Sequence, residues 1–197
     1  MFRRLIRQLG VVVLIFSSGV VHAHTGHGTS GIFNGLIHPF GLDHLLAMVA
    51  VGVWSVSALP RNKAWWGPGV FMSALIVSAA LGATGVSVPY LETLIAMSVV
   101  LFGAMLMISR IKLPVTVGLS AIAVAASLHG LAHGAETPET GFASYAFGFL
   151  LTTASLHLGG VMVGLGIRKY LSQQAPLAVQ LLGVGCGSAG FYLLSQM

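Results

Sequence analysis

The sequence contains little charge and a single cysteine. Only 7% of its 197 residues are charged, while 56% are hydrophobic and the mean hydropathy is +0.93. So few charged residues leave too little polar surface to cover a water-soluble protein of this size, and we therefore expect lipid to be its main solvent. The lone Cys186 excludes an intrachain disulfide framework and a cluster of thiolate ligands.

Signals for nucleic acid and nucleotide binding are also missing. The nine basic residues are scattered in ones and twos, so they form no patch large enough for nucleic acid, despite a pI near 9.9. Neither a Gly-Lys phosphate-binding motif nor the alternation of a β-strand interrupts the apolar sequence. We therefore expect no ATP-driven machine in this chain, and any driving force must come from a gradient or from another protein.

Residues 1–23 have the pattern of a cleavable signal peptide. Three arginines precede an apolar run at 9–16, and Val21 and Ala23 supply small residues at the −3 and −1 positions of a cleavage site. An uncleaved membrane anchor is the alternative, but this run is short against the roughly 20 residues that cross a bilayer as a helix.

Cleavage at that position creates a short periplasmic segment, 24–31, at the new N-terminus. His24 and His27 lie in it, beside a free amine. We expect this segment to capture a divalent ion, and a polar tail with incidental histidines is the alternative.

Six apolar stretches follow and predict an all-α, polytopic transmembrane domain over 32–197. They lie at about 32–59, 64–83, 88–108, 113–133, 142–167 and 176–194. Every Lys and Arg after the signal falls in the loops that follow the first, third and fifth stretches. By the positive-inside rule these loops are cytoplasmic, so both mature termini should face the periplasm from a bacterial inner membrane.

Glycines at helical spacing mark the last two stretches. Gly160 and Gly164 lie in the fifth, and Gly183 and Gly187 lie in the sixth. This spacing lets helix backbones approach closely. We expect helix packing within the chain, with a homo-oligomer built on one of these faces as the alternative.

Ionisable side chains interrupt the first stretch, in the run HPFGLDH at 38–44. A charged group at membrane depth costs on the order of 2.5–3.5 kcal/mol, so such groups mark a site or a pathway. Pro39 lacks an amide proton and its ring clashes with a preceding carbonyl, which predicts a kink in this helix. The kink allows His38 to turn back toward Asp43 and His44. Asp43 is then a metal ligand or an acceptor that fixes the His44 tautomer, and a purely structural Asp–His pair is the alternative.

A second group of ligand types lies in the fourth stretch. His129 and His133 are one helical turn apart and Glu136 follows, so all three share a face if the helix continues. A histidine ladder bonded to the backbone is the alternative. Two further candidates lie along the path: Glu92, one turn inside the outer end of the third stretch, and His157, near the middle of the fifth.

The ligand types narrow the choice of metal. Imidazole and carboxylate groups without thiolate suit borderline divalent ions such as nickel, cobalt and zinc. Ligand type alone does not choose among these three ions, and nothing in the sequence indicates an organic cofactor.

Two motifs resemble the signatures of the HupE/UreJ family of nickel and cobalt permeases: HPFGLDHLLAM at 38–48 and LHGLAHGAE at 128–136. The resemblance extends to the exported N-terminus, the histidines after it, the chain length and the six stretches. Leu128 stands where the family more usually has phenylalanine. Carried over by position, the resemblance implies metal-handling roles for six residues: His38, Asp43, His44, His129, His133 and Glu136.

Family members supply nickel to hydrogenase or urease maturation, and some are linked to cobalt. The resemblance therefore implies an uptake permease for Ni²⁺, or for Co²⁺, rather than an enzyme. Two rivals use the same histidines: an intramembrane metalloenzyme or haem protein, and a metal sensor that binds without translocating.

Overall fold

The computed structural model describes residues 31–111, 113–136 and 142–197, and these residues form helices without a strand. The elements are α2 (Gly31–Ile37), η1 (His38–Phe40), α3 (Leu42–Ala58), η2 (Arg61–Lys63), α4 (Trp66–Ala83), α5 (Leu91–Met107), α6 (Val115–Ala135), α7 (Phe142–Tyr170), η3 (Ser172–Gln174) and α8 (Ala175–Ser195). The expected signal peptide, His24 and His27 lie outside the described residues and remain predictions.

Several helices are long and apolar enough to cross a membrane. Four qualify on their own: Arg61–Ala83, Val115–Ala135, Ala143–Tyr170 and Ser172–Ser195. A fifth span is formed if Gly31–Phe40 and Leu42–Ala58, which meet at a bend of 68°, are counted together. The remaining helix, α5, is apolar but has only 17 residues. The all-α prediction holds for the described residues, and four or five spans rather than six meet the test of length and composition.

The outer surface of the helices is apolar, while several polar side chains lie inside. Val77, Met162 and Phe191 are 64%, 59% and 64% exposed, whereas His129 and Ser55 are fully buried. Water would penalise so much exposed apolar surface, whereas acyl chains cover it without cost. This distribution fits a helical membrane protein whose polar groups serve an internal site.

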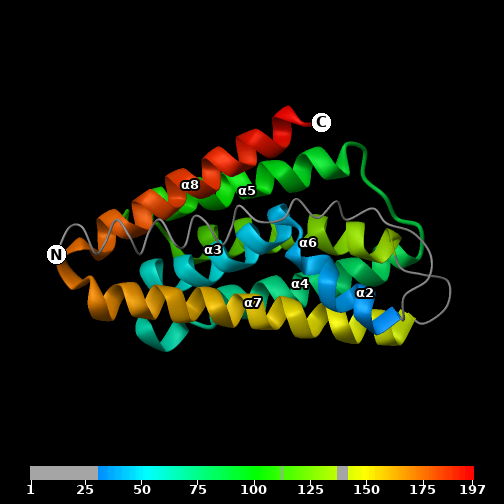
Figure 1. Ribbon diagram of the computed structural model, residues 1–197, viewed down its shortest axis with the longest axis horizontal. Helices are drawn as coiled ribbons and strands as arrows, with labels where there is room; N and C mark the ends of the chain where they lie inside the picture. Colours follow the sequence, from blue (N-terminus) through cyan, green and yellow to red (C-terminus); the bar gives the residue numbers. More distant parts are fainter. Residues whose placement is uncertain (1–30, 112, 137–141) are drawn as a thin grey trace.

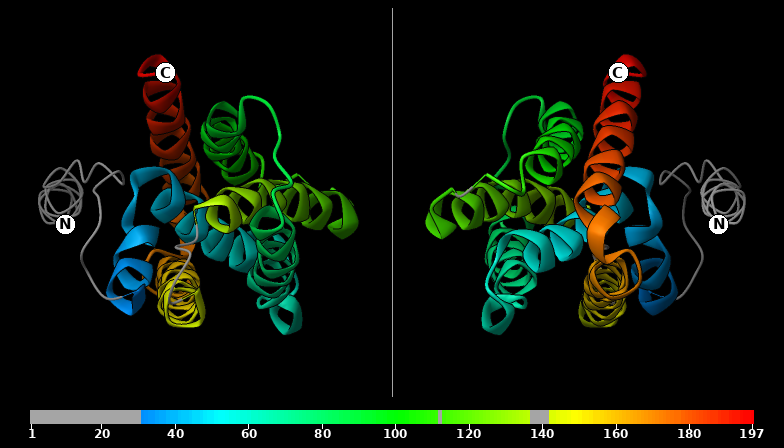
Figure 2. Two further views of the ribbon diagram at one scale, coloured as in Figure 1. Left: turned by 90° about the vertical axis from the view of Figure 1, so that its right-hand side faces the viewer. Right: turned by 90° about the vertical axis from the view of Figure 1, so that its left-hand side faces the viewer.

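Close pairs of helices build the bundle. In Figures 1 and 2, α4 lies along α6, α5 lies along α8, and α2 and α3 lie against α7. A Cβ at Gly160 of α7 would meet Val49 of α3 at backbone atoms, and one at Gly183 of α8 would come within 2.7 Å of the Gly103 carbonyl of α5. The small-residue faces predicted from the sequence are therefore used for packing within the chain.

The backbones of α6 and α4 lie in close contact at Gly134. A Cβ on Gly134 would lie 2.7 Å from the amide nitrogen of Ala83 and against the carbonyl of Ala79, both backbone atoms. Backbone cannot rotate aside as a side chain can, so the two helices would have to separate. This contact holds α6, which carries His129 and His133, at a fixed distance from α4.

Replacing Gly134 with alanine should therefore destabilise the protein. We expect a loss of about 1–3 kcal/mol, the usual cost of overpacking, measured by thermal unfolding in detergent. Gly159→Ala on α7 is the matched control, because no atom lies within 4 Å of a Cβ built there. Equal melting temperatures for the two variants would contradict a tight α4–α6 contact.

The predicted kink at Pro39 is confirmed. Helix α2 ends at Ile37, a single 3₁₀ turn follows, and Gly41 adopts an extended conformation with φ −49° and ψ 139° before α3 begins. The Gly41 amide donates to the His38 carbonyl at 3.1 Å, which closes the turn that Pro39 opens. As a result, His38 and His44 stand on two arms of one broken helix.

The far end of α6 decides whether Glu136 shares the helical face of His129 and His133. The helix ends at Ala135, and Glu136 is its C-cap with φ −90° and ψ 3°. Glu136 therefore does not continue a regular helical stripe with His129 and His133, because the last residue has left helical geometry. Its side chain nevertheless reaches the site from just beyond the helix.

Candidate metal centre

Three histidines from separate segments converge at the break in the first span. Each of His38, His44 and His133 offers a ring nitrogen, and these ligand atoms all lie within 4.8 Å of one another. The ring centroids are 4.6 Å apart for His38 and His133, and 4.5 Å apart for His44 and His133. Two nitrogens bound to one metal ion lie within about 4.2 Å of each other, because each metal–nitrogen bond is about 2.0–2.1 Å long. Small rotations of the three rings would bring their nitrogens within that limit.

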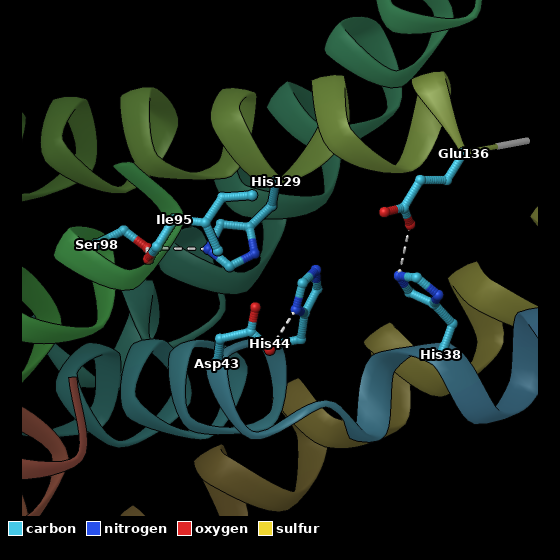
Figure 3. Close-up of polar contacts among 7 residues, drawn as sticks. All are labelled: His38, Asp43, His44, Ile95, Ser98, His129 and Glu136. Atoms are coloured by element: carbon cyan, nitrogen blue, oxygen red, sulfur yellow. Dashed lines mark hydrogen bonds and ion pairs between the residues drawn. The ribbon is translucent and has the colours of Figure 1, made fainter. Parts of the chain in front are cut away.

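Asp43 fixes the orientation and the tautomer of His44. The Asp43 Oδ1 atom lies 2.8 Å from Nδ1 of His44 (Figure 3). A carboxylate accepts, so Nδ1 carries the proton in the neutral ring and Nε2 keeps its lone pair. The Nε2 atom is buried and has no hydrogen-bond partner among the described residues. Of the two roles that the sequence left open for Asp43, this geometry favours the acceptor.

A serine does the same for His129, which lies beside the three converging rings at 4.8 Å from the His44 centroid. The Ser98 hydroxyl donates to the Ile95 carbonyl at 2.7 Å, so its oxygen must accept from Nε2 of His129 at 2.9 Å (Figure 3). That leaves the lone pair on His129 Nδ1, which is buried without a partner in the described part of the chain. Ser98 is thus a positioning residue for a fourth imidazole.

Replacing Ser98 with alanine should weaken metal binding. The His129 ring loses the acceptor that selects its tautomer, and losses of such outer contacts typically cost about 10–100-fold in metal affinity. We expect Ni²⁺ titrations of the purified protein to show an affinity at least about tenfold lower. Ser98→Thr keeps the hydroxyl and should restore affinity, whereas wild-type affinity in Ser98→Ala would show that the contact has no part in binding.

Glu136 and His38 form the outer edge of the centre. Glu136 Oε2 lies 3.3 Å from His38 Nε2, and their side chains are 38% and 15% exposed. Figure 3 shows the two side chains reaching toward each other from the end of α6 and from the turn before α3. This edge is more accessible than His44, His129 and His133, which are buried.

Aromatic side chains of α7 and α4 wall the centre. The Phe149 ring lies 4.0 Å from that of His133, and Tyr145 lies 6.2 Å from His38. Phe71 of α4 contacts both His129 and His157. These rings exclude water, which strengthens the attraction between an ion and its ligands.

The sequence-predicted residues separate into those gathered at the centre and those away from it. His38, Asp43, His44, His129, His133 and Glu136 come together. Glu92 is exposed in the first turn of α5, and His157 is buried beside Phe71, whose ring also contacts His129. Sequence reasoning missed Ser98 and the aromatic wall, because a single serine or phenylalanine in an apolar helix carries no distinctive pattern.

Comparison with known proteins shows the family of this chain. The family model described as HupE / UreJ protein matches residues 11–193 of the chain. The chain belongs to the HupE/UreJ family. It is 36% identical over 177 residues to Protein HupE of Rhizobium leguminosarum bv. viciae, which covers 89% of this chain and 90% of that protein. No solved structure matches the chain.

Membership confirms the resemblance carried by the two motifs. The HupE/UreJ family is linked to nickel and cobalt uptake for hydrogenase and urease, and its members are transport and accessory proteins. Both motifs, at 38–48 and 128–136, fall within the matched range.

Proposed function

We propose that this protein is an uptake permease for Ni²⁺, with Co²⁺ as the other candidate substrate, in a bacterial inner membrane. It captures the ion with His24 and His27, binds it at the centre of His38, His44 and His133, and passes it inward. The cargo then serves hydrogenase or urease maturation proteins.

The convergence of three imidazoles from separate segments is the observation that carries this proposal. Buried polar groups without partners cost about 1–3 kcal/mol each, and a bound cation would remove that cost. His44 Nε2 and both ring nitrogens of His133 are buried without a partner among the residues described. Neutral imidazoles beside Asp43 and Glu136 provide the donors and the negative charge that a borderline divalent cation needs.

The membrane potential is a sufficient driving force. A divalent cation that moves to the negative side gains roughly 4.6 kcal/mol per 100 mV, twice the value for one charge. This gain favours accumulation by about three decades, since about 1.4 kcal/mol is a factor of ten. Passive facilitated passage is therefore adequate, and coupling to protons is not required.

The proposal includes six crossings with both mature termini in the periplasm. Exposed Trp65 and Trp66 support it, because tryptophan side chains are enriched at membrane interfaces. The Lys63 Nζ atom lies 4.2 Å from the centre of the Trp66 ring, and a lysine at an interface favours the cytoplasmic side. Cysteines at Asn62 and Gln196 test it by labelling of intact spheroplasts with an impermeant maleimide. We expect labelling of Gln196→Cys but not of Asn62→Cys, and the reverse pattern would overturn this orientation.

Radioactive Ni²⁺ uptake into vesicles that contain the purified full-length protein tests the function. With an inside-negative potential, we expect uptake well above that of empty vesicles, competed by unlabelled Co²⁺ but not by Mg²⁺. Uptake equal to that of empty vesicles would contradict a permease. Binding without uptake would instead favour a sensor, and purification with stoichiometric haem or iron would favour a redox protein.

A further inference from the structure

His157 is a buried imidazole with a fixed tautomer and one ring nitrogen that has no described hydrogen-bond partner. It is 2% exposed, and its Nδ1 lies 2.8 Å from the backbone carbonyl of Thr153. A carbonyl only accepts, so Nδ1 carries the proton and Nε2 keeps the lone pair. That Nε2 atom has no hydrogen-bond partner within the described part of the chain.

The Thr153 hydroxyl is a second buried group without a partner, one helical turn before His157. The side chain is fully buried, and its Oγ1 makes no hydrogen bond to any described residue. Hydroxyls elsewhere in these helices behave differently, since Ser55, Ser78 and Ser155 each donate to the carbonyl four residues earlier. Two neighbouring unsatisfied groups on one face of α7 therefore mark a place for a ligand.

The His157 ring lies on a line of contacting rings that begins at the centre of His38, His44 and His133, which we call the outer centre. The Phe71 ring lies 5.8 Å from the His129 ring and 4.7 Å from the His157 ring. Both histidines therefore contact the same phenylalanine side chain. His129 in turn lies 4.8 Å from His44. A cation leaving the outer centre thus meets His157 after passing one phenylalanine side chain.

We propose that His157 Nε2 and Thr153 Oγ1 form a second, inner station for the transported divalent cation, a proposal that rests on the proposed function. The helix that carries both residues, α7, contains no acidic residue, whereas Asp43 and Glu136 lie at the outer centre. Neutral donors bind the cation more weakly than donors paired with carboxylates. Weak inner binding favours release, because a conduction site must hold its ion loosely enough to let it leave.

Near-isosteric apolar variants test the inner station. His157→Leu and Thr153→Val remove the ligand atoms with little change in volume, so a merely structural role predicts near-normal melting temperatures and unchanged uptake. The proposal predicts instead that Ni²⁺ uptake falls about tenfold in each, equivalent to a barrier about 1.4 kcal/mol higher. High-affinity Ni²⁺ binding to the purified protein should stay within twofold, because the outer centre is intact.

Ser155→Ala is the matched control, since Ser155 lies between the two residues in sequence but is exposed on the opposite side of α7. Uptake at the wild-type rate in both test variants would overturn the inner station while leaving the permease intact. Loss of high-affinity binding together with uptake would also overturn it, because His157 would then belong to the outer centre. If vesicles with the unaltered protein take up no Ni²⁺, the proposed function fails and the inner station fails with it.

Discussion

Replacing both His44 and His133 with alanine should abolish Ni²⁺ uptake and high-affinity binding. These two rings are 4.5 Å apart and contribute two of the three converging nitrogens. Without them only His38 of the three converging rings and the adjacent His129 ring remain, and these two imidazoles no longer offset the dehydration of a divalent ion. We expect uptake into vesicles to fall to the level of empty vesicles, a loss of about a hundredfold or more.

Loss of fold is the competing explanation for such a result, and two measurements separate it. Truncating the two histidines leaves small cavities and removes the partner of Asp43, but it also removes buried polar atoms without partners, so the double variant should melt at a moderately lower temperature and still unfold in one transition. Ser127→Ala is the matched control on α6, because Ser127 bonds only to a carbonyl of its own helix among the contacts described. A double variant that unfolds in one transition and still transports Ni²⁺ at the wild-type rate would contradict the proposed centre.

Asp43→Asn should reduce Ni²⁺ affinity by about 10–100-fold, the usual effect of removing an outer partner of a metal-binding histidine. The substitution removes a negative charge and weakens the 2.8 Å contact that holds the proton on Nδ1 of His44. The remaining amide can donate as well as accept, so it no longer specifies one tautomer of the ring.

A double-mutant cycle distinguishes the two roles of Asp43. If Asp43 acts through His44, adding Asp43→Asn to His44→Ala should cost little more affinity than His44→Ala alone. Additive losses would instead show that the Asp43 carboxylate ligates the cation independently. Ni²⁺ titration of the four purified proteins gives the coupling directly.

The sequence predicts the residues of the centre better than it predicts their geometry. Ionisable groups are so costly in lipid that six of them in two motifs are conspicuous, and the Pro39 break follows from the missing amide proton. The role of Ser98 depends on its contact with His129, and that contact is made by the three-dimensional packing of α5 against α6. No periodicity in the sequence reports such a contact.

The sequence also does not predict where the helix that carries His133 ends. The sequence places Glu136 on the face of His129 and His133 only if the helix continues, and α6 ends at Ala135. Glu136 still contacts His38 because the broken first span brings that histidine to the end of α6. Local pattern thus identified both partners, but their meeting depends on the bend of 68° between the two arms.

X-ray absorption at the nickel edge of the purified, Ni²⁺-loaded protein tests the central claim most directly. The account predicts scattering from at least three imidazole rings with metal–nitrogen distances of about 2.1 Å, and a loss of two rings in the His44→Ala, His133→Ala variant. A spectrum of the intact protein with oxygen or sulfur neighbours and no imidazole scattering would contradict it.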